Sequence, residues 1–209
     1  KVILLCINMT FLYSLNLILH DYDNPSASHI LDAEIHDDLL IISGMIGGIE
    51  FYDISNPEIL NHLDNLSLSS GGGQGGGTKP NCIVANGDYA YVTTSNGLGV
   101  INISNPSNPQ YLGIVSGTSN YILENLDVHE NFLAVAAHED GVLFYDISNP
   151  SNPEHVYTLS TVNAWAVQME PFEHINYEFV IFVADQNSIY SLAYMYYNDH
   201  HNFSPIYMY

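Results

Sequence analysis

A ten-residue phrase that occurs three times constrains this chain more than any other feature of its sequence. The three copies read GIEFYDISNP at residues 48–57, GLGVINISNP at 97–106 and GVLFYDISNP at 141–150. Their equivalent residues Asp53, Asn102 and Asp146 are 49 and 44 positions apart. A period of this length is typical of β-propellers, in which each repeat folds as one four-stranded blade. The phrase therefore predicts an all-β fold of propeller blades, each with four antiparallel strands.

The residues between the phrases supply the other strands of each unit. First strands are predicted at Leu31–Ile35, Cys82–Ala85 and Leu126–His129, second strands at Leu39–Ser43, Tyr89–Thr94 and Phe132–Ala137, and fourth strands at Tyr111–Val115 and His155–Leu159. Polar and glycine turns such as Asn96-Gly97 and Asp140-Gly141 separate the second strand from the phrase, and such pairs favour tight hairpins. The phrase itself is the third strand, and its Asn-Pro ends it because proline donates no backbone hydrogen bond.

A fourth unit follows without the phrase. Ile189 lies 47 residues after Val142, so the period continues. The strands predicted for this unit are Ala164–Met169, Phe179–Ala184, Ile189–Tyr194 and the tail Pro205–Tyr209, with residues 170–178 as a lengthened turn. We expect about four units that form an arc or a fragment of a larger propeller.

The chain divides into six segments on this basis. They are a signal-like apolar segment or remnant of an earlier blade at 1–20, a first unit at 21–66, a Gly-rich insert at 67–80, a second unit at 81–115, a third at 116–160 and a degenerate fourth at 161–209. Residues 2–19 are nearly all apolar and follow Lys1, as in a secretory signal. Ile7 also lies 47 residues before Ile54, which suits a piece of another blade, and both interpretations stay open.

The repeated phrases resemble the LVIVD repeat family, whose units carry a Leu-x-Ile/Val-x-Asp-Ile-Ser-x-Pro pattern. The matching stretches are Ile49–Pro57, Leu98–Pro106 and Val142–Pro150, and Asn102 departs from the family's usual Asp. The resemblance covers roughly residues 29–160. It implies a β-propeller on a secreted or cell-surface protein, and it supplies no catalytic residues.

The charge of the chain limits its partners. It has 23 acidic residues against two lysines, which gives a net charge of −21. Nucleic acid and anionic membrane surfaces are excluded as partners, because both bind through Lys and Arg. Cations or basic protein surfaces are possible partners, although no motif supports a cation site. The cysteines Cys6 and Cys82 have no metal-ligand spacing, and we expect neither a metal nor a cofactor.

Four residues are candidate binding residues, namely His138, Glu139, Asp140 and Asp185. The first three lie in the turn between the second and third strands of the third unit, and Asp185 lies at the same place in the fourth. These turns and the connections between units are expected to line one end of a propeller channel. A solvated turn is the simpler interpretation, because the residues lack the spacing of a metal motif.

Other polar motifs carry less. The Asp, Ser and Asn of the repeated phrase suit a scaffold turn that occurs once per blade. Residues 21–24 mimic the start of a calcium loop, residues 199–201 carry two histidines in a predicted loop, and residues 70–77 are Gly-rich but lack a phosphate-loop pattern. The expected function is a non-enzymatic secreted or cell-surface interaction module that binds an unknown protein or surface polymer. The alternative is a propeller hydrolase or metal-dependent enzyme that uses His138, Glu139 and Asp140.

Overall fold

The computed structural model describes residues 28–46, 48–68, 78–174, 177–197 and 200–205. Every regular element in these ranges is a β-strand. The first sheet consists of β1 (Ser28–His36), β2 (Leu39–Ile46), β3 (Gly48–Asp53) and β4 (Asn61–Leu66). The second consists of β5 (Pro80–Asn86), β6 (Tyr89–Thr94), β7 (Gly97–Asn102) and β8 (Gln110–Ile114). The third consists of β9 (Leu126–His129), β10 (Phe132–Ala136), β11 (Val142–Asp146) and β12 (Glu154–Leu159), and the fourth of β13 (Ala164–His174), β14 (Tyr177–Asp185), β15 (Ile189–Tyr197) and β16 (His200–Pro205).

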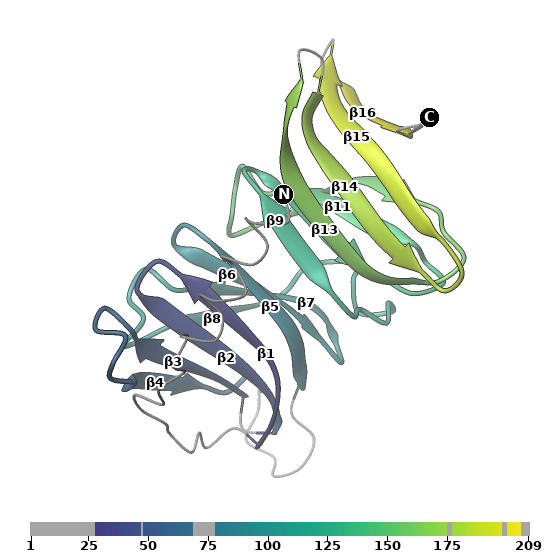
Figure 1. Ribbon diagram of the computed structural model, residues 1–209. Helices are drawn as coiled ribbons and strands as arrows, with labels where there is room; N and C mark the ends of the chain where they lie inside the picture. The colour runs from purple at the N-terminus through teal and green to yellow at the C-terminus, as the bar shows by residue number, and fades with distance from the viewer. Residues whose placement is uncertain (1–27, 47, 69–77, 175–176, 198–199, 206–209) are drawn as a thin grey trace, which may run out of the picture.

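Each sheet is an antiparallel meander whose strands follow chain order, as in a propeller blade. Neighbouring sheets meet through their first strands, so that β1 contacts β5, β5 contacts β9 and β9 contacts β13. Figure 1 shows the four sheets one after another in an arc that does not close into a ring. The predicted fold, about four four-stranded units in an arc, is confirmed.

Among the described residues the core consists of three apolar clusters, one between each pair of neighbouring sheets. Ile41, Phe51 and Ile83 belong to the cluster between the first and second sheets. The two middle sheets have neighbours on both faces, and β6 and β10 are accordingly buried at every position after their first residue. The continuous apolar pattern of these strands follows from this two-sided burial.

The repeated phrase forms the same turn in all three copies. The side-chain Oδ1 of Asp53, Asn102 and Asp146 accepts a hydrogen bond from the backbone N–H two residues later, at 2.8, 3.0 and 2.7 Å. The N–H of the following isoleucine in each phrase bonds back to the turn between the first and second strands, for example Ile147 to Asn131 at 2.8 Å. In each of the first three sheets the phrase therefore supplies the third strand and the structural turn that follows it.

The fourth sheet differs from the sequence prediction in two places. The expected long turn over residues 170–178 is wrong, because β13 runs to His174 and pairs with β14 through Pro171↔Phe179 and His174↔Tyr177. Pro171 is tolerated because β13 is an edge strand of its sheet.

The last strand also lies elsewhere than predicted. It is β16, at His200–Pro205, rather than Pro205–Tyr209, because β15 extends to Tyr197 and its partner starts directly afterwards. His200 and His201 are therefore strand residues and not loop residues.

Several sequence predictions fall outside the described residues: those on segment 1–20, on residues 21–24 and 70–77, on Asp199 and on residues 206–209. Within the described part of the chain there is no helix of the length and apolarity that a membrane span requires.

Candidate functional site

His138 lies at the junction of the third and fourth sheets. It occupies the turn between β10 and β11, with a φ of +48°. Its backbone pairs with Ala164, since each N–H donates to the other residue's carbonyl oxygen, at 3.1 and 2.9 Å. This pairing fixes the turn against the start of β13 and directs the imidazole along the connection between the sheets.

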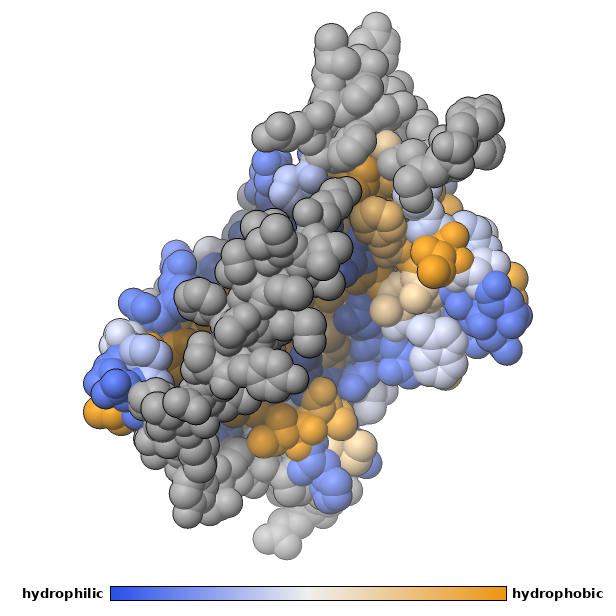
Figure 2. Space-filling view, in the orientation of Figure 1, coloured by the Kyte–Doolittle hydropathy of each residue, from blue (hydrophilic) through white to orange (hydrophobic). Residues whose placement is uncertain are grey.

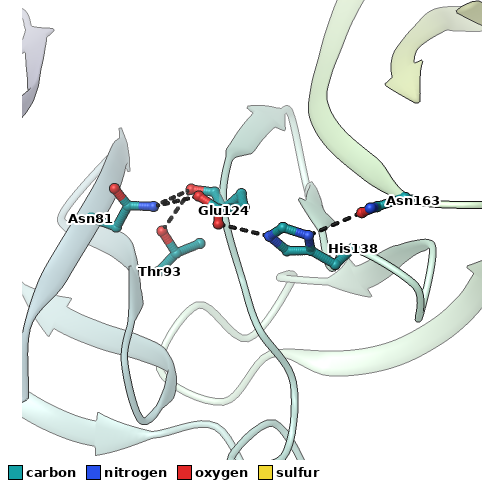
Figure 3. A network of polar contacts seen from close by, with 5 residues as sticks. All are labelled: Asn81, Thr93, Glu124, His138 and Asn163. Carbon is teal, nitrogen blue, oxygen red and sulfur yellow. Dashed lines mark hydrogen bonds and ion pairs between the residues drawn. The ribbon is translucent and has the colours of Figure 1, made fainter. Parts of the chain in front are cut away.

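Both ring nitrogens of His138 are engaged (Figure 3). Nε2 lies 2.7 Å from Oε1 of Glu124, and Nδ1 lies 3.0 Å from Oδ1 of Asn163. Trp165 packs edge-to-face against the ring, with 4.5 Å between ring centroids. The side chains of His138 and Glu124 are 18% and 33% exposed, so the pair lies at the surface without being fully solvated.

The network continues into the second sheet. Asn81 Nδ2 donates to the backbone oxygen of Glu124 at 2.9 Å and to its Oε2 at 3.2 Å. Thr93 Oγ1 donates to the same backbone oxygen at 3.1 Å. These bonds link the start of β5, the segment before β9 and the segment before β13, so one set of side chains connects three sheets.

Asp185 joins the same network through Asn163. Its Oδ1 accepts a hydrogen bond from the backbone N–H of Asn163, and the N–H of Gln186 donates to the Asn163 carbonyl at 3.0 Å. Two of the four candidate residues, His138 and Asp185, thus bind the same residue, Asn163. Glu139 and Asp140 are exposed, and in the described part of the chain no hydrogen bond or ion pair joins their side chains to the network.

Sequence reasoning missed Asn81, Glu124 and Asn163. The segments before the first strands were expected to line the same end as the turns after the second strands, and this signal pointed to the right region. The individual residues were not evident because they do not repeat from unit to unit. A side chain that recurs in each period can be found by self-comparison of the sequence, whereas these three occur once each.

The comparisons with known proteins address the family and the fold. The model of the LVIVD repeat matches residues 79–116 and 123–161, which contain the second and third sheets. Both stretches are LVIVD repeats. No curated protein matches the sequence.

Two solved structures of designed proteins share the fold. The computationally designed Ika4 protein has a TM-score of 0.59 at 13% identity, and the match covers 85% of this chain and 98% of that one. For the designed Ika8 protein the values are 0.58 and 12%, with 88% of this chain and 50% of that one covered. At these identities the likeness concerns the fold alone.

The hydrogen-bonded network around His138, hereafter the His138 network, includes residues of both LVIVD repeats. Its geometry is that of a structural contact between sheets. Asn81 belongs to the first repeat, Glu124 and His138 to the second, and Asn163 lies two residues after its end. Since the Asn163 amide can offer its oxygen or, when turned, its NH₂, the ring is bonded on both sides in either charge state. Neither nitrogen is left for a substrate or a metal. In the described ranges, no group of three or more His, Cys, Asp or Glu residues is arranged to hold a metal ion.

Cys82 follows Asn81 of the network directly in the sequence. Cys82 lies on β5 in the first LVIVD repeat, and its Sγ accepts a hydrogen bond from Asn125 at 3.5 Å. Burial raises the pKa of the Cys82 thiol to about 12, which keeps it protonated at neutral pH. A protonated, half-buried thiol is a poor nucleophile, so the side chain behaves as a packing residue.

Exposed apolar side chains surround the network. We call this region the loop end of the arc and define it by the network and by Leu31, Met45, Ile122, Val162 and Trp165, which are 44, 39, 66, 62 and 49% exposed. A pocket of about 250 Å³ opens there, with Asn81 and Lys79 in its wall. Ile122 lies in the short segment between the two LVIVD repeats. Figure 2 shows hydrophobic side chains at the lower end of the first sheet and over the fourth sheet.

Proposed function

We propose that this chain is a non-enzymatic interaction module that binds a protein or a surface polymer at the loop end of its arc. The exposed apolar side chains of the loop end carry this proposal. Ile122 and Val162 are each more than three-fifths exposed on connections between sheets, and Trp165, three residues after Val162, is half exposed. Contiguous apolar surface rimmed by polar groups marks interaction sites, and tryptophan is enriched among the residues that dominate binding energy.

The polar network supports this proposal by giving the surface a fixed shape. His138 packs against Trp165 and is hydrogen-bonded to Glu124 and Asn163. The indole of Trp165 therefore packs against an imidazole whose position is fixed on both sides. A surface that is rigid before binding loses less conformational entropy when it binds.

We further propose a secreted or cell-surface location. Lys1 and the apolar residues 2–19 support an export signal, and the resemblance of the repeats to a largely extracellular family supports the same location. Expression of the whole chain fused to a reporter, followed by fractionation, tests this. Reporter confined to the cytoplasm would contradict the location and leave the binding proposal untouched.

The binding proposal is tested by capture from native medium and envelope fractions. The variant Trp165→Ala with Ile122→Ser should lower capture of the partner at least about tenfold, because truncation of a central anchor typically removes more than 1 kcal/mol of binding energy. Leu112, which is 49% exposed on β8, supplies a matched control as Leu112→Ala. Equal capture by all variants would overturn the assignment to the loop end.

A further inference from the structure

A second and larger pocket lies away from the loop end, between the first and second sheets. Its volume is about 480 Å³. It lies at the turns between first and second strands and near the ends of the repeated phrases. Leu39 and Leu63 of the first sheet and Ile103 of the second are among the residues that line it. We call it the Leu39 pocket.

The pocket follows from one difference between the repeats. Leu39, Tyr89 and Phe132 begin the second strands of their sheets, and each pairs with the sixth residue of its repeated phrase. The positions are therefore equivalent. Tyr89 packs against the cluster between the second and third sheets, and Phe132 packs in the next cluster, 4.6 Å from the ring of Tyr194. The first sheet has a smaller side chain at this position, and the space that the aromatic rings fill elsewhere is open.

The walls of the Leu39 pocket are chemically divided. Leu39, Leu63 and Ile103 form an apolar floor, and Ile103 is only 5% exposed. The carboxylates Asp37, Asp38, Asp53 and Asp88 stand around it. Hydrogen bonds from Ser55 hold the pKa of Asp53 below its usual range, so its charge is kept at neutral pH. Among the lining residues only His36 can carry a positive charge, and Lys79 lies in the wall of the other pocket.

We propose that the Leu39 pocket receives a lysine or arginine side chain of a protein partner. Such a side chain has an aliphatic stem and a charged head, and it buries the stem on apolar surface while the head stays polar. Leu39 and Leu63 would contact the stem, and the surrounding aspartates would accept hydrogen bonds from the head. The aspartates have no counter-charge from a lysine or arginine of the pocket itself, so a basic partner supplies the complementary potential.

The residues that line the Leu39 pocket favour a lysine or arginine side chain over a bare cation. An ion bound by carboxylates needs several oxygens converging on one point, and no group of three or more His, Cys, Asp or Glu residues in the described ranges does so. The apolar floor would add nothing to the binding of an ion, whereas it suits a hydrocarbon stem. The site is independent of the loop end, because its lining shares no residue with the 250 Å³ pocket or the His138 network.

The probe is an acetylated and amidated Gly-Arg-Gly peptide, with the same peptide carrying citrulline as its uncharged analogue. Binding to the full chain is followed by NMR at an ionic strength of about 0.15 M, where charges more than roughly 8 Å apart are screened. The arginine peptide should shift the amides of Asp37, Asp38 and Asp88, and the citrulline peptide should bind at least about tenfold more weakly, because charge-assisted hydrogen bonds are roughly twice as strong as neutral ones.

Leu39→Phe tests the pocket directly, since it installs the residue of the third unit and should abolish the shifts while the chain stays folded. Asp37→Asn with Asp88→Asn should weaken binding without filling the space, and this variant decides the matter if Leu39→Phe does not fold. Glu139→Gln with Asp140→Asn removes two charges at the loop end and should leave peptide binding unchanged, as should Trp165→Ala. Equal binding of the arginine and citrulline peptides, shifts spread over the whole acidic surface, or full binding by Leu39→Phe would overturn the proposal.

Discussion

The glycine where the third strand starts shows how tightly a single residue is constrained in this fold. A Cβ added at Gly141 would lie 2.1 Å from the carbonyl oxygen of Leu159, and at Gly48 a Cβ would lie 2.2 Å from that of Leu66. Both glycines have positive φ, at +85° and +100°. The fourth strand thus passes too close for any side chain, and this recurs at equivalent positions.

We predict that Gly141→Ala destabilises the chain by more than about 3 kcal/mol, because it combines a left-handed backbone with a backbone clash. Gly87 is the matched control. Its φ is +55° and nothing lies within 4 Å of a Cβ placed there. Gly87→Ala should therefore lose only about 1 kcal/mol. Urea unfolding measures both, and similar losses would show that the clash relaxes.

The His138 network leads to a second prediction for single residues. His138→Ala removes the partner of Glu124 Oε1 and of Asn163 Oδ1. We expect a loss of about 1–3 kcal/mol in the free energy of unfolding, since partly buried polar atoms lose their hydrogen bonds. Glu139→Ala, one residue away and exposed, should change stability by less than about 0.5 kcal/mol. Equal small effects of the two substitutions would mean that hydrogen bonds to water replace those of the His138 network without loss of stability.

The sequence predicted the structural role of residues that recur in each repeat. It did not predict the role of residues that occur in one repeat only. The Asp, Asn and Ser of the phrase could be assigned to a turn because three copies share one geometry. Asn81, Glu124 and Trp165 hold equivalent positions before or at the start of the first strands, and they differ in size and charge. Their meeting with His138 depends on how two sheets are placed against each other, which no local pattern encodes.

The first strands are joined by a device that becomes visible only at the level of elements. On β1, Asp32 and Glu34 accept hydrogen bonds from the backbone N–H groups of Ile83 and Ala85 on β5, at 2.9 and 3.2 Å. At the next-but-one junction, Asn125, which directly precedes β9, and Asp127 on β9 accept from the N–H groups of Val167 and Met169 on β13, at 2.9 and 2.5 Å. The middle junction lacks these acceptors and uses Asn86, whose Nδ2 donates to the Glu130 carbonyl at 2.6 Å. Side chains of the preceding sheet thus accept hydrogen bonds from backbone N–H groups along the edges of β5 and β13.

These acceptors predict a pH effect. Burial raises the pKa of the Asp127 carboxyl above its ordinary value of 3.8. The folded chain then binds this proton more tightly than the unfolded chain, so the stability due to this group falls as pH rises through the window above 3.8. Asparagine keeps the acceptor oxygen, as Asn125 does beside it, but cannot ionise.

Asp127→Asn should therefore become more stable relative to the wild type as pH is raised from about 3 to about 7. Unfolding in urea at several pH values measures the difference. Glu34→Gln should behave alike, because burial also raises the pKa of Glu34. A relative gain of the wild type with pH would mean that the hydrogen bonds from the backbone dominate over burial.

The existence of the strands was predictable from apolar runs and turns, but their ends in the fourth sheet were not. The expected turn over residues 170–178 includes Pro171, which an edge strand accommodates, and β13 and β14 each continue beyond the predicted bounds. Without the repeated phrase to mark the third strand, nothing in the local sequence fixed where the fourth strand begins.

At the scale of the molecule, position along the arc decides how completely a sheet is enclosed. The second sheet shares apolar clusters with the first and the third, and the third shares clusters with the second and the fourth. Among the described residues, the fourth sheet shares a cluster with the third only, and Phe182 and Ile189 are 39% and 82% exposed. The period of the sequence predicted the blades, whereas the curvature of the arc comes from the contacts between first strands.

This asymmetry predicts the order in which the chain opens. In a repeat array each unit is stabilised mainly by its interfaces with adjacent units, so a unit with one interface opens at a lower free energy than a unit with two. Amides of β10 and β11 should exchange with deuterium most slowly, and those of β14 and β15 at least about tenfold faster, which corresponds to a gap of roughly 1.4 kcal/mol. Both pairs are central strands with complete antiparallel ladders, so the comparison does not depend on unpaired edges.

Leu133→Ala should lower protection in both sheets because it weakens the third, whereas Phe179→Ala should speed exchange in the fourth sheet first. Uniform protection of all four sheets would contradict this order and would show that the chain unfolds as a single cooperative unit.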